Sequence, residues 1–362
     1  MQLGLRNRLR LISLLPILIL FTVASYFVYN SYSSYKGAGQ LQVRLEGNKQ
    51  LTELINNLSR ERGMTVMYMG NASPATLKSL QAQRLIVDEK IAAYEKFLTS
   101  MDHSSNAESE KTASLNAVVA KLQNQLNQTR PIVDSQKANF DQVFSDIYSK
   151  SQEKLISELA ELAELHFDEE INALSSTYLS LVRASEYSSI ERDYITYLLS
   201  RATPLSSDEL DKWTALISKA DMFTIEGMSD KNIQAKLKAS LFSEDNTELY
   251  QDITTERSGI LQVSATGKYP TQSGIWFAMI SEKIDAIDGA QKILIEAMDN
   301  RALTIQHNAV RLLILAIFVW ILLLKSTFIS AFVVQSLILS LDGVSFLKSK
   351  NSTSMLLSLK NF

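Results

Sequence analysis

The arginines of the central segment are the residues whose type and surroundings could do chemistry. Arg60 and Arg62 stand in an apolar run, between Leu58 and Met64. An arginine in such company must be paired or must face a polar cavity, because an isolated buried charge is costly. Its planar guanidinium suits a small planar anion as well as a carboxylate. The run therefore predicts either an anion site or an ion pair between helices. The ten arginines between 31 and 308 are Arg44, Arg60, Arg62, Arg84, Arg130, Arg183, Arg192, Arg201, Arg257 and Arg301.

Other side-chain chemistry is sparse. His103, His166 and His307 are far apart, and no second histidine stands at metal-ligand spacing. The acidic run after His166 would spread over several directions on a helix, which favours a solvated face over a metal site. The sequence has no Gly-rich phosphate loop, no Gly-x-Ser-x-Gly motif and no cysteine. We therefore expect no enzyme, no metal and no cofactor.

The spacing of leucine and isoleucine predicts helices throughout the central segment. Leu51, Leu54, Ile55 and Leu58 follow the spacing of one apolar helix face, and the pattern recurs along the chain. Only 12 glycines and 5 prolines are present, too few for the many turns of a β-sandwich. We expect an all-α domain of about eight helices, packed as two four-helix bundles. The expected breaks are Gly70 to Pro74, Asp102 to Ser109, Thr203-Pro204 and Gly267 to Gly274, with helix starts at Ser73-Pro74 and at Ser206 to Asp208.

An internal echo supports two halves. Glu61-Arg62 is followed by an aromatic and methionine stretch, a break and a long helix, and Glu191-Arg192 is followed by a similar series. The two Glu-Arg pairs are 130 residues apart.

Two apolar stretches predict membrane spans at 11–30 and 310–334, the first without a charge and the second interrupted by Lys325, whose long side chain can reach the cytoplasmic headgroups. Arg6, Arg8 and Arg10 precede the first span, and positive residues beside a span stay in the cytoplasm. A cleaved signal peptide is the alternative, but this stretch ends in bulky aromatic residues. The expected segments are a cytoplasmic N-terminus at 1–10, the first span at 11–30, an extracytoplasmic sensor domain at 31–309, the second span at 310–334 and a short cytoplasmic tail at 335–362.

The charge is divided between these segments. Of the 36 basic and 39 acidic residues, 28 and 38 lie in 31–308, so that this segment has a net charge near −10. It offers no basic stripe to neutralise phosphates, and we expect no nucleic acid as a partner. The lipid bilayer is an expected partner of the two spans.

Three elements in order resemble a known family. The run Arg60-Glu61-Arg62-Gly63-Met64-Thr65 is similar to the Glu-Arg-Gly-x-Ser signature of the nitrate- and nitrite-sensing domain of bacterial receptors. The run Tyr187 to Arg192 resembles the mid-domain Gly-x-Glu-Arg element of that family. Trp276-Phe277 and Ile284 to Ile287 resemble its closing helix. The resemblance covers about residues 50–295.

The resemblance implies two four-helix bundles and a nitrate or nitrite anion bound by arginines on separate helices. Arg62 matches the first of these arginines. Arg257 or Arg192 is expected as the second, and Arg60 is a further candidate. Met64-Thr65 replaces the small pair of the family, and Asp193 stands where a small residue is common.

The expected function is therefore a transmembrane receptor of the bacterial inner membrane, active as a homodimer in chemotaxis or two-component-like signalling. One alternative is a sensor of the same architecture for another small ligand or a binding protein. Another is a membrane-anchored partner of full-length receptors without a ligand. Ser340 to Leu347 looks like the start of a receptor linker, and about fifteen residues remain after it. We expect either a truncated receptor or an excerpt of one.

Overall fold

The computed structural model describes the backbone of residues 5–101, 106–163, 168–223, 225, 228 and 230–359. Side chains at 5–14, 17, 106–109, 111, 162–163, 334, 337–338 and 341–359 lie outside this description. All regular structure within it is helical, which confirms the predicted all-α class. The elements in chain order are α1 (Leu5–Gly70), α2 (Pro74–Ser100), α3 (Asn106–Asp134), the π-helix η1 (Gln142–Ser149), α4 (Lys150–Ala163), α5 (Glu169–Arg201), α6 (Ser207–Ala220), α7 (Lys231–Leu241), α8 (Glu244–Val263), the 3₁₀ turn η2 (Ser264–Thr266) and α9 (Ser273–Leu359).

Two predicted helix starts are confirmed in atomic detail. The Ser73 side chain accepts a hydrogen bond from the Thr76 amide, and the Ser73 amide donates to the Thr76 hydroxyl. The two bonds form a capping box before α2. Ser206 and Glu209 make the same reciprocal pair before α6. Each cap satisfies backbone donors that the first helical turn leaves without partners.

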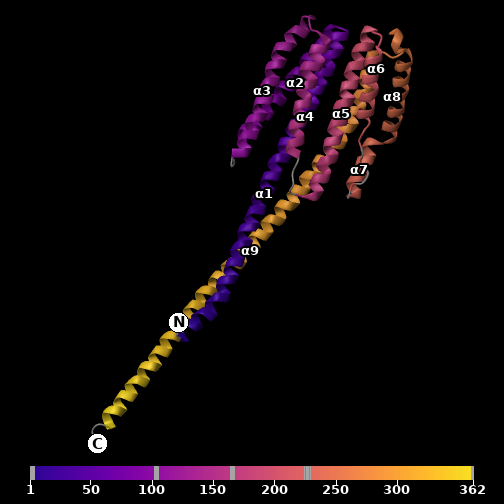
Figure 1. The fold of residues 1–362 in the computed structure, drawn as a ribbon. Coiled ribbons are helices and arrows are strands. Elements are labelled where there is room, and N and C mark those ends of the chain that lie inside the picture. Colours follow the sequence, from indigo (N-terminus) through magenta and orange to yellow (C-terminus); the bar gives the residue numbers. More distant parts are fainter. Residues whose placement is uncertain are drawn as a thin grey trace. The chain divides into compact units, whose positions relative to one another are not determined.

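The chain divides into two compact units, of which residues 41–302 form the larger. In this unit α1 to α4 lie side by side (Figure 1). Helices α5, α6, α8 and α9 share one hydrophobic cluster, in which Trp213 and Trp276 meet edge to face. Burial of these apolar side chains holds the helices together without cysteine. The other members of the cluster are Ile195, Leu198, Leu205, Ile253, Ile260, Ile280 and Ile284.

The smaller unit consists of residues 1–40 and 303–362, the first part of α1 and the last part of α9. The indole N–H of Trp320 donates to the Ser25 hydroxyl at 2.9 Å, and the Trp320 ring packs on Phe21. Within the described part of the chain, α9 is the one helix with a stretch that is apolar and long enough to cross a membrane, and that stretch lies within Ser273–Val333. The first predicted span includes side chains at 11–14 and 17 that are outside the description.

Helices α1 and α5 run in the same direction and approach closely at two glycines of α1. A Cβ atom on Gly63 would stand 2.5 Å from Nη2 of Arg192 and 2.7 Å from Oδ1 of Asp193. One on Gly70 would stand 2.7 Å from Cβ of Ser200. The two glycines are one heptad apart, so they lie on one face of α1. Because Gly63 has no side chain, the Arg192 and Asp193 side chains of α5 can pack directly against the backbone of α1.

We predict that Gly63→Ala destabilises the protein, although alanine favours helix by about 1 kcal/mol over glycine. The new methyl group would push apart a buried arginine and carboxylate, and overpacking of this kind costs about 1–3 kcal/mol. Thermal unfolding of the full chain, followed by circular dichroism, measures the change.

Gly289→Ala is the matched control, since glycine 289 also lies inside a helix. Its new Cβ would make an ordinary contact of 3.5 Å with Oγ of Ser240. This variant should be as stable as the parent or slightly more stable. Equal gains in both variants would contradict the close approach at Gly63.

Candidate functional site

A buried carboxylate joins two of the predicted arginines. Asp193 on α5 accepts from Nε of Arg62 at 2.7 Å through one oxygen, and from Nε of Arg192 at 2.8 Å through the other. All three side chains are almost fully removed from solvent. The two Glu-Arg elements that are 130 residues apart in sequence thus lie level with each other on α1 and α5, and Asp193 lies between their arginines.

Arg62 has a second carboxylate partner. Its Nη1 donates to Glu186 at 2.6 Å, so every part of its fork is engaged by acids of α5. Burial alone would lower the pKa of Arg62, but Glu186 and Asp193 raise it well above its ordinary value. Burial raises the pKa of the Glu186 carboxyl, and Arg62 opposes that shift. Arg62 is therefore permanently charged and held as an ion pair between helices.

Arg60 and Arg192 line a small cavity between α1, α5 and α9. The cavity has about 10 Å³, room for a single water molecule. Hydroxyl groups line it at Ser59, Ser185 and Ser189. Arg192 has two weaker partners here, because Nη1 donates to the Ser281 hydroxyl and Nη2 donates to the Ser59 carbonyl, both at 3.2 Å.

Arg60 differs from the other two arginines in its exposure. It pairs with Asp285 of α9 at 2.6 Å, and the two side chains are 49% and 61% exposed. Such a pair contributes little to stability, since both charges remain in water. Arg60 can therefore leave Asp285 at small cost.

Asp288 of α9 also lines the small cavity and is buried. Burial raises the pKa of its carboxyl to about 6, although a hydrogen bond from Ser185 and the charge of Arg60 act in the opposite direction. The charge of the cavity therefore changes in the mildly acidic range.

Arg257 lies in a different cluster. It donates through Nε and Nη2 to both oxygens of Glu191, at 2.7 and 2.6 Å, and through Nη1 to Asp221 at 2.8 Å. Lys283 also pairs with Asp221. Burial raises the pKa of the Asp221 carboxyl. The positive charges of Lys283 and Arg257 together lower it by more, so the pKa lies below its ordinary value. Arg257 thus binds the residue before Arg192 and does not touch the pair that Asp193 joins.

The first half of the domain repeats this device. Arg130 of α3 donates through Nε and Nη2 to both oxygens of Glu61, at 2.9 and 2.8 Å, and through Nη1 to Asp88. Each of the two carboxylates also accepts a hydrogen bond from an aromatic side chain. The Tyr148 hydroxyl donates to Glu61, and the Trp213 indole N–H donates to Glu191. The internal echo of the sequence therefore corresponds to two copies of one buried ion-pair motif.

Of the four arginines predicted from sequence, the structure brings Arg60, Arg62 and Arg192 together and places Arg257 apart. Their roles as ligands stay predictions, and the pairing of Arg62 with Glu186 and Asp193 matches the alternative of an ion pair between helices. Sequence reasoning missed Glu186, Asp288 and the serines of the cavity. Small polar residues in the middle of a long helix, as in Ala184-Ser185-Glu186-Tyr187-Ser188-Ser189, were the available signal.

His166, the histidine that precedes the acidic run, lies outside the described residues. Among the residues that the structure describes, no three histidine or acidic side chains are grouped so that they could hold a metal ion.

Comparisons with known proteins identify the family and a similar fold. The family model for nitrate and nitrite sensing matches residues 53–299. The chain is also similar to a solved structure described as the NasR transcription antiterminator, with a TM-score of 0.64 and 18% identity. That similarity covers 87% of this chain and 82% of the other, and it shows a shared fold. No curated protein matches the chain. Because the family match spans well over half of the sequence, the protein belongs to the nitrate- and nitrite-sensing family.

Proposed function

We propose that this protein is a non-enzymatic transmembrane receptor whose central segment, 31–309, binds nitrate or nitrite. The observation that carries the proposal is that Arg60 of α1 and Arg192 of α5 line one small cavity, beside the buried Asp193 that Arg192 shares with Arg62. The family match points to the same class of anion. Guanidinium groups bind flat oxyanions through paired, charge-assisted hydrogen bonds.

The donors available to an anion are those whose present partners are weakest. Arg192 donates to two neutral acceptors over long hydrogen bonds, and Arg60 donates to a solvent-exposed carboxylate. An anion in the small cavity would take over donors from both, with the neighbouring serine hydroxyls as further donors. Arg62 would hold Asp193 and Glu186 in place and so position Arg192.

The size of the cavity supplies a mechanism for signalling. A space for one water molecule is too small for nitrate, so binding must widen the contact between α1, α5 and α9. The anion then favours a wider state over the closed state, and this difference in affinity shifts the population. Helices α1 and α9 also contain the two apolar stretches, so the shift would be carried into the membrane.

Exposed apolar side chains in α1 and α9 support the membrane part of the proposal, because soluble surfaces rarely carry such large apolar patches. We assign 11–30 and 310–334 as spans, with both termini in the cytoplasm and the sensor in the periplasm of a bacterial cell. For the packing of the helices we propose two four-helix bundles, and for the assembly a homodimer. The exposed residues include Leu15, Leu18, Ile19, Leu20, Val23, Tyr26, Phe27 and Tyr29 in α1, and Leu312, Ile314, Leu315, Phe318, Phe328, Ile329 and Phe332 in α9.

Calorimetric titration of the purified full chain with nitrate tests the site. We expect saturable binding that weakens at least about tenfold in Arg60→Gln and in Arg192→Lys, since each loses a charge-assisted hydrogen bond. Arg301→Gln is the matched control, because Arg301 is also a partly exposed arginine, paired with Asp168. This control should bind as the parent does. Loss of binding only in Arg257→Gln would move the site to the Glu191 cluster, and absence of binding in the parent would refute the proposal.

Arg62→Ala should act on stability before it acts on the ligand. It would leave Glu186 and Asp193 buried, with their shared partner removed, which costs about 3–5 kcal/mol. In a domain of this size that corresponds to a melting temperature lower by about 6–20 °C. The melting temperature of Arg301→Ala, whose ion pair is partly exposed, should change by only a few degrees. An unchanged melting temperature for Arg62→Ala would contradict the role of this ion pair.

Asp288 should make nitrate binding depend on pH. Its carboxylate repels an anion at neutral pH, and protonation around pH 6 removes the repulsion. A like charge beside the ligand costs on the order of 1–4 kcal/mol, so Asp288→Asn should tighten binding at pH 7.5 by at least about fivefold.

Titrations at pH 7.5 and 5.5 give the measurement for Asp288, since nitrate stays an anion at both values. The parent should bind more tightly at the lower pH, and Asp288→Asn should show little change. The variant should also be more stable at neutral pH, because a raised carboxyl pKa destabilises the fold as pH rises through it. Equal pH dependence in parent and variant would exclude this role.

A further inference from the structure

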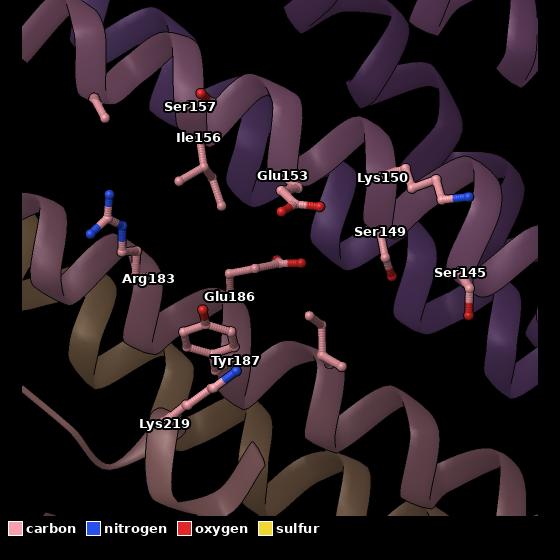
Figure 2. Close-up of a pocket in the computed structure, with 12 residues that line it drawn as sticks. Ser145, Ser149, Lys150, Glu153, Ile156, Ser157, Arg183, Glu186, Tyr187 and Lys219 are labelled. Atoms are coloured by element: carbon pink, nitrogen blue, oxygen red, sulfur yellow. The ribbon is translucent and has the colours of Figure 1, made fainter. Parts of the chain in front are cut away.

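A second and much larger cavity lies between η1 and α4 on one side and α5 and α6 on the other (Figure 2). It has about 560 Å³, within the usual range for small-molecule sites. Nitrate would fill only a small part of it. A ligand of this cavity must therefore be larger than the anion of the proposed function.

The charged side chains of the cavity are grouped by sign, with cations toward its two ends and carboxylates between them. Figure 2 shows Arg183 at one end and Lys150 toward the other, with the carboxylates of Glu153 and Glu186 between them. Lys219 adds a third positive charge on the side of Arg183 and lies over the Tyr187 ring at 5.3 Å. Three cations and two carboxylates give the lining a net charge of +1.

Three of these groups have charge to offer a ligand. Within the described part of the chain, none of Arg183, Lys219 and Glu153 makes an ion pair. Lys150 pairs with Asp146 one turn away, where both side chains are more than half exposed, so this pair is easily exchanged. Serine hydroxyls at 145, 149 and 157 supply further hydrogen-bonding groups.

We propose that this cavity binds an acidic amino acid such as L-glutamate or L-aspartate. The α-carboxylate pairs with Arg183 and Lys219, the ammonium group lies between Glu153 and Glu186, and the side-chain carboxylate reaches toward Lys150. One ammonium and two carboxylates give the ligand a net charge of −1, which complements the lining. This arrangement rests on the cavity alone and does not depend on nitrate binding.

Glu186 connects this cavity to the arginine cluster. It lines the cavity and is also the partner of Arg62 at 2.6 Å. A ligand ammonium that pairs with Glu186 draws on the same carboxylate as Arg62. Occupancy of the large cavity therefore loosens the ion pair between α1 and α5, which gives the receptor a second input.

Calorimetric titration of the detergent-solubilised full chain with L-glutamate and L-aspartate, in buffer free of nitrate, tests the proposal. We expect saturable binding of at least one of them, weakened about tenfold or more in Arg183→Gln and in Glu153→Gln. Arg201→Gln is the matched control, because Arg201 is another exposed arginine of α5 and does not line the cavity. It should bind as the parent does.

Succinate tests the role of the ammonium group, since it keeps two carboxylates and lacks the amine. It should bind at least about tenfold more weakly than the better amino acid. Equal binding of succinate would overturn the assignment to amino acids, and so would parent-like binding in both cavity variants or the absence of heat with both amino acids. None of these results bears on the Arg60 and Arg192 variants, whose readout is nitrate.

Discussion

The burial of charge at the contact between α1 and α5 is the constraint on which the rest of the domain depends. A guanidinium or a carboxylate removed from water must meet its opposite, since an unpaired ion in the interior is too costly to keep. Asp193 meets that condition for Arg62 and Arg192 together, and so it fixes the level at which the two helices lie. Glu61 and Glu191 then fix α3 and α8 against them in the same manner. Gly63 leaves the space in which these groups fit.

This arrangement also limits where a ligand can act. Arginines that are fully engaged by buried carboxylates have no donor to spare, and breaking such pairs would cost more than a weakly bound anion returns. The donors of Arg60 and the outer donors of Arg192 are the exception, since water or neutral oxygen atoms compete for them. The domain thus buries its strongest ion pairs in an ionic centre and places its more easily exchanged contacts at the edge of that cluster.

The sequence predicted the helical class and the helix starts at Ser73 and Ser206, because leucine periodicity and Ser-Pro or Ser-Ser-Asp starts are local signals. The caps at Asp168, Asp230 and Ser243 were not predicted. The sequence also located the Glu-Arg pairs and their echo. It could not assign partners, since Arg62 and its carboxylates are 124 and 131 residues apart and every acid of α5 is chemically able to pair with it. Asp193 was noted only as a departure from the family pattern, and the structure shows why an acid stands there. Arg257 is one of the two arginines expected from the sequence as the second ligand, and in the structure it pairs with Glu191.

The π-helix η1 links two sites of the domain. Its turns are wider than those of an α-helix, and its residues, Gln142–Ser149, continue directly into α4. Ser145 and Ser149 face the large cavity from η1, while Tyr148 holds Glu61 in the ionic centre. Adjacent residues of this one segment, Tyr148 and Ser149, thus connect the ionic centre with the large cavity.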